Sequence, residues 1–516
     1  MNTASLNDKC KLTKFELIFL LSSALLTITF VSTCSPLYPF NPWDDANCFF
    51  TIGRGIVKGL TLYKDLFDHK GPLLYFIYAV AALISDKSFV GIWIIECLAA
   101  SAYAIYSWKI ARLFVNPSKY SVFIMPLFLG VVYTSRMFNF GGNAEELCFP
   151  LLTIMLYIGL KAAVKGDGIP GKSDALICGL ITGSLFWIKY TFVGFAAGLC
   201  LFILILSIKQ KRFVRLWSLV WRFVAGFVII SIPVFNYFIA TKSLDYLWES
   251  YFYDNLALYL TKTDPYPATG IPVLENIVVT LIAIKNTAKE HLAFGVLFLL
   301  TVVSLFFVEK KYRLKVSLLF LVTFAASAGF VFTRSIRIYY YGYILFYCLS
   351  LAVVPVIKAI NLAEKAAKRN PRFISLLISA LFVVLYLFSI FMCKNIYLIF
   401  KPKDFLAQYR VAEIINQTPE AKILTYGVMD EGFYTAAGLL PANRFFGAGK
   451  NIEANYPAIH EEQDRLIDEG YFDYIITSYF LEPDWENYEL IQTETDPYID
   501  FTGEEILIGH KIYKKI

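Results

Sequence analysis

Two acidic residues, Asp44 and Asp45, stand side by side in the segment NPWDDANCFF, shortly after the first apolar run of the chain. A carboxylate held at the boundary between water and lipid can act as a general base that removes a proton from an attacking hydroxyl group. A simpler role is the alternative, because the residues that follow predict a helix, and an aspartate can cap the first turn of a helix. The two roles are compatible, because a cap also fixes the carboxylate.

A second group of chemically active side chains lies in the run DLFDHKGPLLYFI. His69 and Lys70 directly precede Gly71 and Pro72, and proline favours the first turn of a helix, so a helix is expected to begin there. The N-terminus of a helix beside a lysine is suited to bind an anion such as a phosphate. Solvated charge at the rim of a membrane is the alternative, and both interpretations stay open at this point.

Further polar residues interrupt or end apolar runs. Lys189 breaks a long apolar stretch, and an unpaired lysine inside a bilayer is costly, so Lys189 should mark a turn or contact an anion. Glu96 lies inside another apolar run, where it is a functional candidate or the partner of a neighbouring helix. Charges at the ends of spans can simply extend to water, and tyrosines there often form an interfacial belt. The charged residues and the tyrosine that lie at the ends of predicted spans are Arg136, Glu145, Glu146, Arg334, Arg337 and Tyr340.

The elements that must position these side chains are those of a membrane protein. The chain has 516 residues, of which 57% are hydrophobic and 17% are charged, and its mean hydropathy is +0.57. This composition, together with several runs of about 18 or more apolar residues, predicts a polytopic α-helical membrane protein and excludes an ordinary soluble one. The net charge of +6 is carried by loops between apolar runs, where it indicates topology and not nucleic-acid binding.

A topology of about eleven spans agrees with the positive-inside rule. The loops rich in lysine and arginine then fall on the cytoplasmic side, with the N-terminus inside and the C-terminus outside. The expected spans are 15–34, 89–114, 119–135, 147–164, 174–189, 191–208, 218–240, 291–308, 316–333, 338–358 and 372–393.

One apolar run, residues 72–84, is expected not to cross the membrane. As a helix it would be about 20 Å long, whereas a hydrocarbon core is about 30 Å thick. We predict an interfacial or re-entrant helix, which leaves residues 35–88 as one outer loop. Within this loop, the residues after Asp44 predict an amphipathic helix along the membrane surface, with Thr51 and Arg54 on its polar face.

The composition changes at about Ile396. The runs AKILTYG and FDYIITS predict strands, and HEEQDRLIDEG between them predicts a helix with a polar face. No later run is long enough to span a bilayer. The sequence therefore predicts a membrane domain over residues 1–395 and a small extracytoplasmic α/β domain over residues 396–516.

The motifs of the first outer loop resemble those of the GT-C membrane glycosyltransferases, which include protein O-mannosyltransferases and the aminoarabinose transferase of lipid A. These enzymes typically have an Asp-Glu pair after the first span, then an amphipathic helix, then a Lys-Pro-Pro-Leu-like motif that starts the next helix. The matching positions here are Asp44-Asp45 and Lys70-Gly71-Pro72-Leu73, all within residues 41–78. The chain departs from the pattern in its second acid and in the glycine that replaces the first proline.

The resemblance implies a GT-C-like fold in a bacterial plasma membrane, with the active site on the outer face. It implies transfer of a hexosyl or pentosyl group from a polyprenyl-phosphate donor to an acceptor, which would be a cell-wall glycan, a teichoic acid, a lipid or a protein. Asp44 would be the general base of an inverting reaction, and the other candidate catalytic acids are Asp45, Glu145 and Glu146. The candidate substrate-binding residues are His69, Lys70, Arg136, Lys189, Arg334, Arg337 and Tyr340.

Two other classes of protein stay open. A lipid-linked glycan flippase, without chemistry, would have polar residues deep in several spans and broken helices in repeated halves. A polysaccharide polymerase or ligase would place its large outer loop late in the chain. The early acidic loop favours the glycosyltransferase over both. No cofactor is expected, and since the acids at positions 44 and 45 do not form a D-x-D motif, the sequence gives no support for a metal ion without excluding one.

Overall fold

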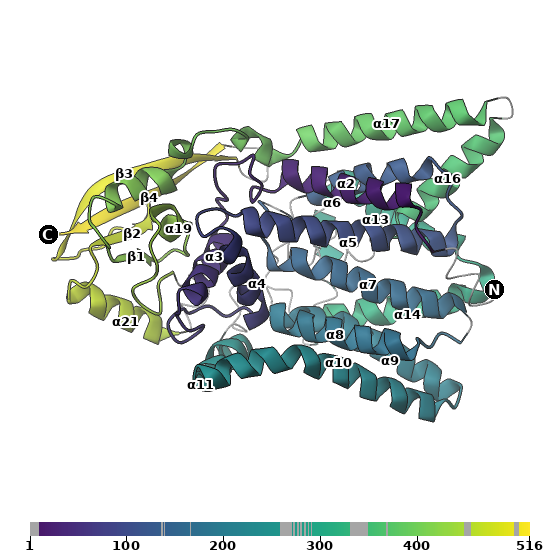
Figure 1. The fold of residues 1–516 in the computed structure, drawn as a ribbon, viewed down its shortest axis with the longest axis horizontal. Coiled ribbons are helices and arrows are strands. Elements are labelled where there is room, and N and C mark those ends of the chain that lie inside the picture. The colour runs from purple at the N-terminus through teal and green to yellow at the C-terminus, as the bar shows by residue number, and fades with distance from the viewer. Residues whose placement is uncertain are drawn as a thin grey trace.

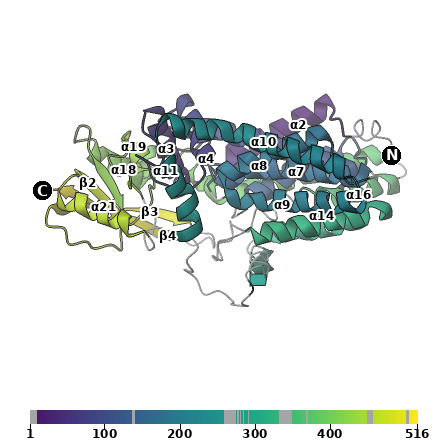
Figure 2. The same cartoon turned by 90° about the horizontal axis from the view of Figure 1, so that it is seen from below.

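A computed structural model defines the fold. It describes residues 10–135, 138, 140–165, 167–258, 292–330, 349–367, 370–447, 456–499 and 505–516, together with single positions between 271 and 289. The helices form an elongated bundle, and the strands gather at one end of it (Figure 1). A view turned by 90° shows the same separation along the long axis (Figure 2).

The bundle contains helices of two kinds. Within the described residues, seven helices are long and apolar enough to cross a membrane, which makes the chain a multi-pass membrane protein. These are α2 (Lys14–Val31), α5 (Val90–Phe114), α7 (Ala144–Lys165), α9 (Val193–Lys209) with the preceding turn η2 (Tyr190–Phe192), α10 (Phe213–Ala240), α14 (Lys310–Gly329) and α17 (Pro371–Phe391). The shorter ones are α6 (Ile124–Tyr133), α8 (Lys172–Ile188), α13 (Leu292–Ser304) and α16 (Val353–Ala366).

The prediction of about eleven spans is confirmed in part. Seven of the predicted spans coincide with the seven helices of spanning length. The spans predicted at 119–135, 174–189 and 291–308 coincide with the shorter helices α6, α8 and α13. The span predicted at 338–358 lies mostly outside the described residues.

The strands form a single mixed sheet after the last long helix. Strands β1 (Ile423–Tyr426) and β2 (Tyr474–Ser478) pair in parallel, and helix α21 (Pro457–Asp468) lies between them in sequence, as the two strand-like runs predicted. The sequence did not predict the antiparallel strands β3 (Tyr488–Ile499) and β4 (Glu505–Lys515), because charged residues and a proline interrupt their apolar pattern. The strand order is β1-β2-β4-β3. The division of the chain at residue 395 stays a prediction.

Two helices of the first outer loop lie at the junction between the bundle and the sheet (Figure 1). Helix α4 (Pro72–Ile84) begins and ends as the sequence predicted and has only 13 residues, whereas helix α3 (Asp44–Val57) includes Asp44, the residue predicted to cap it. The two helices cross closely, because a Cβ atom at Gly53 would come within 2.6 Å of the backbone of Tyr78. The absence of a side chain at this crossing lets α3 lie directly on α4.

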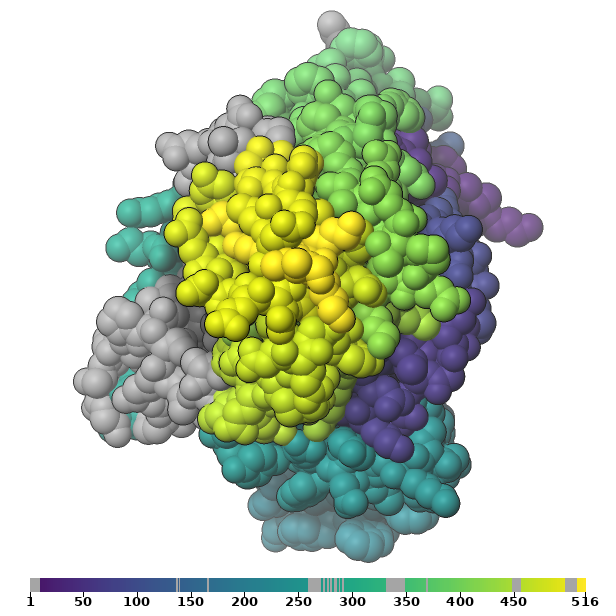
Figure 3. All heavy atoms as spheres, turned by 90° about the vertical axis from the view of Figure 1, so that its left-hand side faces the viewer, coloured from purple at the N-terminus to yellow at the C-terminus, as the bar shows by residue number. Residues whose placement is uncertain are grey.

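The polar face of α3 does not face water, which corrects the sequence-based expectation. Thr51 is fully buried and donates a 2.5 Å hydrogen bond to Asp430, and Arg54 is 5% exposed and donates to the carbonyl of Tyr434 at 3.3 Å. The C-terminal residues, yellow and green in Figure 3, cover this end of the molecule beside the purple N-terminal segment. The amphipathic pattern therefore marks contact with the rest of the chain and not a free membrane surface.

The start of α4 is fixed against the end of α8. The amide of Gly71 donates to the carbonyl of Ile188 at 3.2 Å, and a Cβ atom at Gly71 would overlap the carbonyl group of Trp187. Since the φ of Gly71 is −71°, glycine is required here by space and not by backbone conformation. This contact explains why the chain has glycine where the related motif has proline, and it places Lys70 beside Lys189.

We predict that Gly71→Ala destabilises the protein by about 1–3 kcal/mol, because the added methyl group would push α4 away from the backbone of α8. Gly329→Ala is the matched control, because a Cβ atom there would meet nothing within 4 Å. Thermal unfolding of the purified variants in detergent measures the difference. An unfolding temperature for Gly71→Ala equal to that of the control would contradict the proposed packing.

Candidate active site

Asp44 occupies the first turn of α3 in a half-buried position. The N-cap of α3 is Trp43, which makes no side-chain capping bond. The prediction that Asp44 caps this helix is therefore wrong, because Asp44 is the first residue within it. The carboxylate of Asp44 still accepts a 2.8 Å hydrogen bond from the amide of Asp45. Burial and then the negative charges of Asp45 and Glu431 raise the pKa of Asp44 from 3.8 to about 7, against the opposing effect of Lys70. A carboxylate of this kind is a stronger base than an ordinary aspartate.

Asp68, His69 and Lys70 form a connected series before α4. Asp68 is 6% exposed, and its oxygens accept hydrogen bonds from the Tyr75 hydroxyl and the His69 amide, both at 2.7 Å. The Nδ1 of His69 lies 3.0 Å from Asp68, and its Nε2 lies 3.2 Å from the Nζ of Lys70. Solvated rim charge is therefore the wrong description of Asp68, which is buried, and of His69, which is half-buried between Asp68 and Lys70.

Glu145 and Lys189 form a buried ion pair between the start of α7 and the end of α8. Both residues are less than 10% exposed. Glu145 also interacts electrostatically with Lys70, as Asp44 does. The structure thus brings Asp44, Lys70 and the Glu145–Lys189 pair into one charged cluster.

Glu146, the residue after Glu145, contacts a different set of groups. Glu146 accepts a 3.2 Å hydrogen bond from the amide of Gly142, and that amide also donates to Glu96 at 2.7 Å. Glu96 accepts a second bond from the Ser32 hydroxyl at 2.7 Å. The backbone at Gly142 has a φ of +77°, which favours glycine, and it turns the chain toward the two carboxyl groups. Glu96 and Glu146 therefore hold the loop before α7, whereas Glu145 faces the cations.

Four predicted site residues lie outside the described residues. They are Arg136, Arg334, Arg337 and Tyr340. His291, which the sequence did not place in any site, lies outside them as well.

A small cavity opens beside Asp44 at the junction with the C-terminal sheet. Its volume is about 250 Å³, and its walls include Trp43, Asp44, Gln408, Glu431 and His510. The sequence analysis did not identify the last three residues. A signal for Glu431 exists in the run GVMDEG, because acids that follow the carboxyl end of a parallel strand often face a ligand site. Gln408 and His510 carry no comparable signal, since they reach the cavity only through the tertiary fold.

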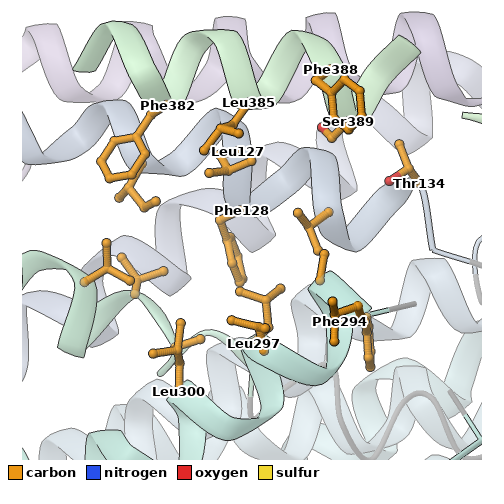
Figure 4. Close-up of a pocket in the computed structure, with 18 of the residues that line it drawn as sticks. Leu127, Phe128, Thr134, Phe294, Leu297, Leu300, Phe382, Leu385, Phe388 and Ser389 are labelled. Atoms are coloured by element: carbon orange, nitrogen blue, oxygen red, sulfur yellow. The ribbon is translucent and has the colours of Figure 1, made fainter. Parts of the chain in front are cut away.

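A second cavity lies within the bundle and is almost wholly apolar. It has a volume of about 600 Å³ and lies between helices α6, α13, α16 and α17. In Figure 4, Leu127 and Phe128 face Leu297 and Leu385 across this space. The described residues that line it carry no charge, so the cavity suits a hydrocarbon chain and not a phosphate.

Within the residues that the structure describes, no group of three or more histidine, cysteine, aspartate or glutamate side chains could hold a metal ion.

Part of the chain matches a mannosyltransferase family model, and its fold is similar to that of solved structures of ArnT. Residues 69–237 match the family described as dolichyl-phosphate-mannose-protein mannosyltransferase. The match begins at His69, and so it includes Lys70 and Lys189 but not Asp44. No curated protein matches the chain.

Two of the solved structures that the chain resembles are those of ArnT from Cupriavidus metallidurans. One is a crystal structure bound to undecaprenyl phosphate, with a TM-score of 0.58, 10% identity and coverage of 96% of this chain and 97% of ArnT. The other is the apo state, with a TM-score of 0.58, 11% identity and the same coverage. At 10% and 11% identity, the likeness to ArnT shows a shared fold and nothing more, over 96% of this chain.

We predict that Lys189→Met destabilises the protein by about 3–5 kcal/mol, because Glu145 would be left as an unpaired buried charge. The double variant Lys189→Met/Glu145→Gln should recover most of this loss in thermal unfolding. Lys58→Met is the matched control, because its partner Asp86 lies 3.8 Å away and is 44% exposed, so its loss should be at most about 1 kcal/mol. Additive losses in the double variant would contradict a direct pair.

Proposed function

We propose that the protein is a glycosyltransferase that moves a sugar from a polyprenyl-phosphate donor to an acceptor hydroxyl group on the outer face of a bacterial plasma membrane. The observation that supports this function is one cluster that contains both a half-buried carboxylate of raised pKa, Asp44, and an oriented cation, Lys70. The fold shared with ArnT and the family match from His69 onward support the same conclusion.

In the proposed reaction, Asp44 removes the proton of the acceptor hydroxyl as its oxygen attacks the anomeric carbon of the donor sugar. The bond from that carbon to the phosphate oxygen breaks, and its electron pair leaves with the polyprenyl phosphate. Attack from the face opposite the phosphate inverts the anomeric configuration. Asp45, beside the base, helps to keep the pKa of Asp44 high through its negative charge.

Lys70 would stabilise the departing phosphate at the N-terminus of α4. His69 and Asp68 hold its Nζ in place, and the Glu145–Lys189 pair adds a second cation nearby. The roles of Arg136, Arg334, Arg337 and Tyr340 in binding the donor stay part of the proposal. The apolar cavity of Figure 4 offers hydrocarbon-lined space for an isoprenoid chain within the bundle.

We predict that Asp44→Asn lowers sugar transfer by about 10²–10⁴-fold, because the amide cannot accept the proton. The variant should fold normally, since an amide oxygen can still accept the bond from the amide of Asp45. Transfer of labelled sugar from a synthetic polyprenyl-phosphate donor by purified protein measures the effect. Asp86→Asn is the control, because Asp86 lies in the same outer loop and is 44% exposed. Full activity of Asp44→Asn would refute the assignment of the base.

We predict that transfer rises with pH through about 7, the pKa of Asp44, because only the ionised carboxylate can accept a proton. Glu431→Gln removes one of the negative charges that raise this pKa, so the midpoint of the pH profile of kcat/KM should move to lower pH. Glu461→Gln changes an exposed glutamate on α21 and should leave the midpoint unchanged. A shift of the Glu431→Gln profile to higher pH would show that the electrostatic argument is wrong.

A further inference from the structure

The peptide group between His69 and Lys70 is fixed at both of its edges. Its carbonyl oxygen, which belongs to His69, accepts a 2.7 Å hydrogen bond from the Nδ2 of Asn255. Its N–H group, which belongs to Lys70, donates to the hydroxyl of Tyr75 at 3.2 Å. A trans peptide group is planar and has its C=O and N–H on opposite sides, so bonds at both edges stop the plane from rotating.

The next peptide group, between Lys70 and Gly71, is fixed in the same way. Its carbonyl oxygen accepts a hydrogen bond from the hydroxyl of Tyr63, and its N–H donates to the carbonyl of Ile188 at 3.2 Å. The two planes meet at the Cα of Lys70, so together they fix the direction in which its side chain leaves the backbone. The Nζ at the end of that side chain lies 3.2 Å from the Nε2 of His69. Lys70 is therefore oriented at both ends.

Asn255 comes from a distant and unusual helix. It lies in η3 (Trp248–Leu258), a π-helix that follows the short helix α11 (Leu244–Leu247), and Figure 1 places α11 at the end of α10 nearest the sheet. Helices of this kind are rare and frequently occur at functional sites. The Nδ2 of Asn255 also donates to the carbonyl of Tyr251 at 2.9 Å, and Asn255 is only 4% exposed. Since both acceptors are carbonyl oxygens, the NH₂ group of the side chain must face them.

The π-helix is anchored on the last turn of α8. The hydroxyl of Tyr251 donates to the carbonyl of Phe186, and the rings of Tyr251 and Trp187 are 5.7 Å apart. This turn of α8 ends directly before Lys189. Helix η3 therefore lies on the backbone that positions Lys189 and bonds to the backbone that positions Lys70.

The backbone of Tyr63 has an unfavourable conformation. Its φ is +66°, in the left-handed region that residues with a side chain seldom adopt. Tyr63 is fully buried, and its ring stacks on that of Phe238 at 5.6 Å. Its carbonyl accepts a 2.9 Å bond from the Nε of Arg444. Such a conformation persists only where the surrounding structure fixes it, and it is typical of functional sites. Here it places the Tyr63 hydroxyl against the carbonyl of Lys70.

We propose that Asn255 and Tyr63 are positioning residues for the phosphate of the polyprenyl donor. They fix the peptide planes on either side of Lys70, and so they direct its ammonium group toward the phosphate without contacting the donor themselves. The proposal rests on the glycosyltransferase function proposed above and extends it, since it assigns a role to the π-helix that follows α11.

Binding of undecaprenyl phosphate to the full-length protein in lipid nanodiscs, measured by native mass spectrometry, tests the proposal. Asn255→Leu and Tyr63→Phe each remove one of the bonds, and each should weaken binding by about three- to tenfold. In a Lys70→Met background neither change should weaken binding further, because both residues act through Lys70. Asn361→Leu is the matched control, because Asn361 of α16 donates the same kind of bond, to the carbonyl of Asn116 at 2.9 Å. Its loss should leave binding unchanged.

Two results would overturn the positioning roles. One is binding that neither Asn255→Leu nor Tyr63→Phe weakens. The other is an equal loss with and without Lys70, which would show a general effect on the structure. Transfer of labelled sugar from a polyprenyl-phosphate donor by the unchanged protein keeps the two proposals apart. Absence of transfer, with binding that depends on Lys70 and Asn255, would reject the glycosyltransferase function alone. Transfer, with undiminished binding by both variants, would reject the positioning roles alone.

Discussion

The contact of Gly71 with the last turn of α8 is the constraint on which the candidate site depends. It joins α4, a helix of only 13 residues, to one that lies within the bundle, and it does so without a side chain between them. Lys70 immediately precedes this contact and Lys189 immediately follows the last residue of α8, so both cations are positioned by the same backbone approach. Since α4 also packs against α3, the contact fixes the distance from these cations to Asp44.

Removal from water changes the pKa of the acids in the candidate site. Asp44 has a raised pKa because the chain surrounds it with protein and with two other acids, and Glu431, one of these, comes from the loop after β1. The C-terminal part of the chain thus does more than cover the site. It holds α3 through Thr51 and Arg54, and it adds the polar wall of the cavity beside the base. Catalysis by Asp44 would therefore depend on this junction.

The sequence predicted those features that depend on local pattern. The bounds of α4 follow from Pro72 and the length of the apolar run, and the start of α3 follows from its acids. It did not predict that Thr51 would bond to Asp430, because those residues are 379 positions apart and only the folded chain brings them together. For the same reason, the sequence did not predict that Lys189 pairs with Glu145 or that His510 lines the cavity beside Asp44. The sequence predicted the amphipathic pattern of α3, but the polar face of this helix packs against protein and not against water.

The central claim is that the N-terminus of α4 binds the phosphate of a polyprenyl donor within reach of Asp44. A cryo-electron microscopy structure of the protein with polyprenyl phosphate in a lipid nanodisc tests it most directly. The account predicts phosphate density in contact with the Nζ of Lys70, at about 4 Å or less, on the side that faces Asp44. Phosphate bound at the opposite end of the bundle, or at the outer end but away from Lys70, would contradict the account.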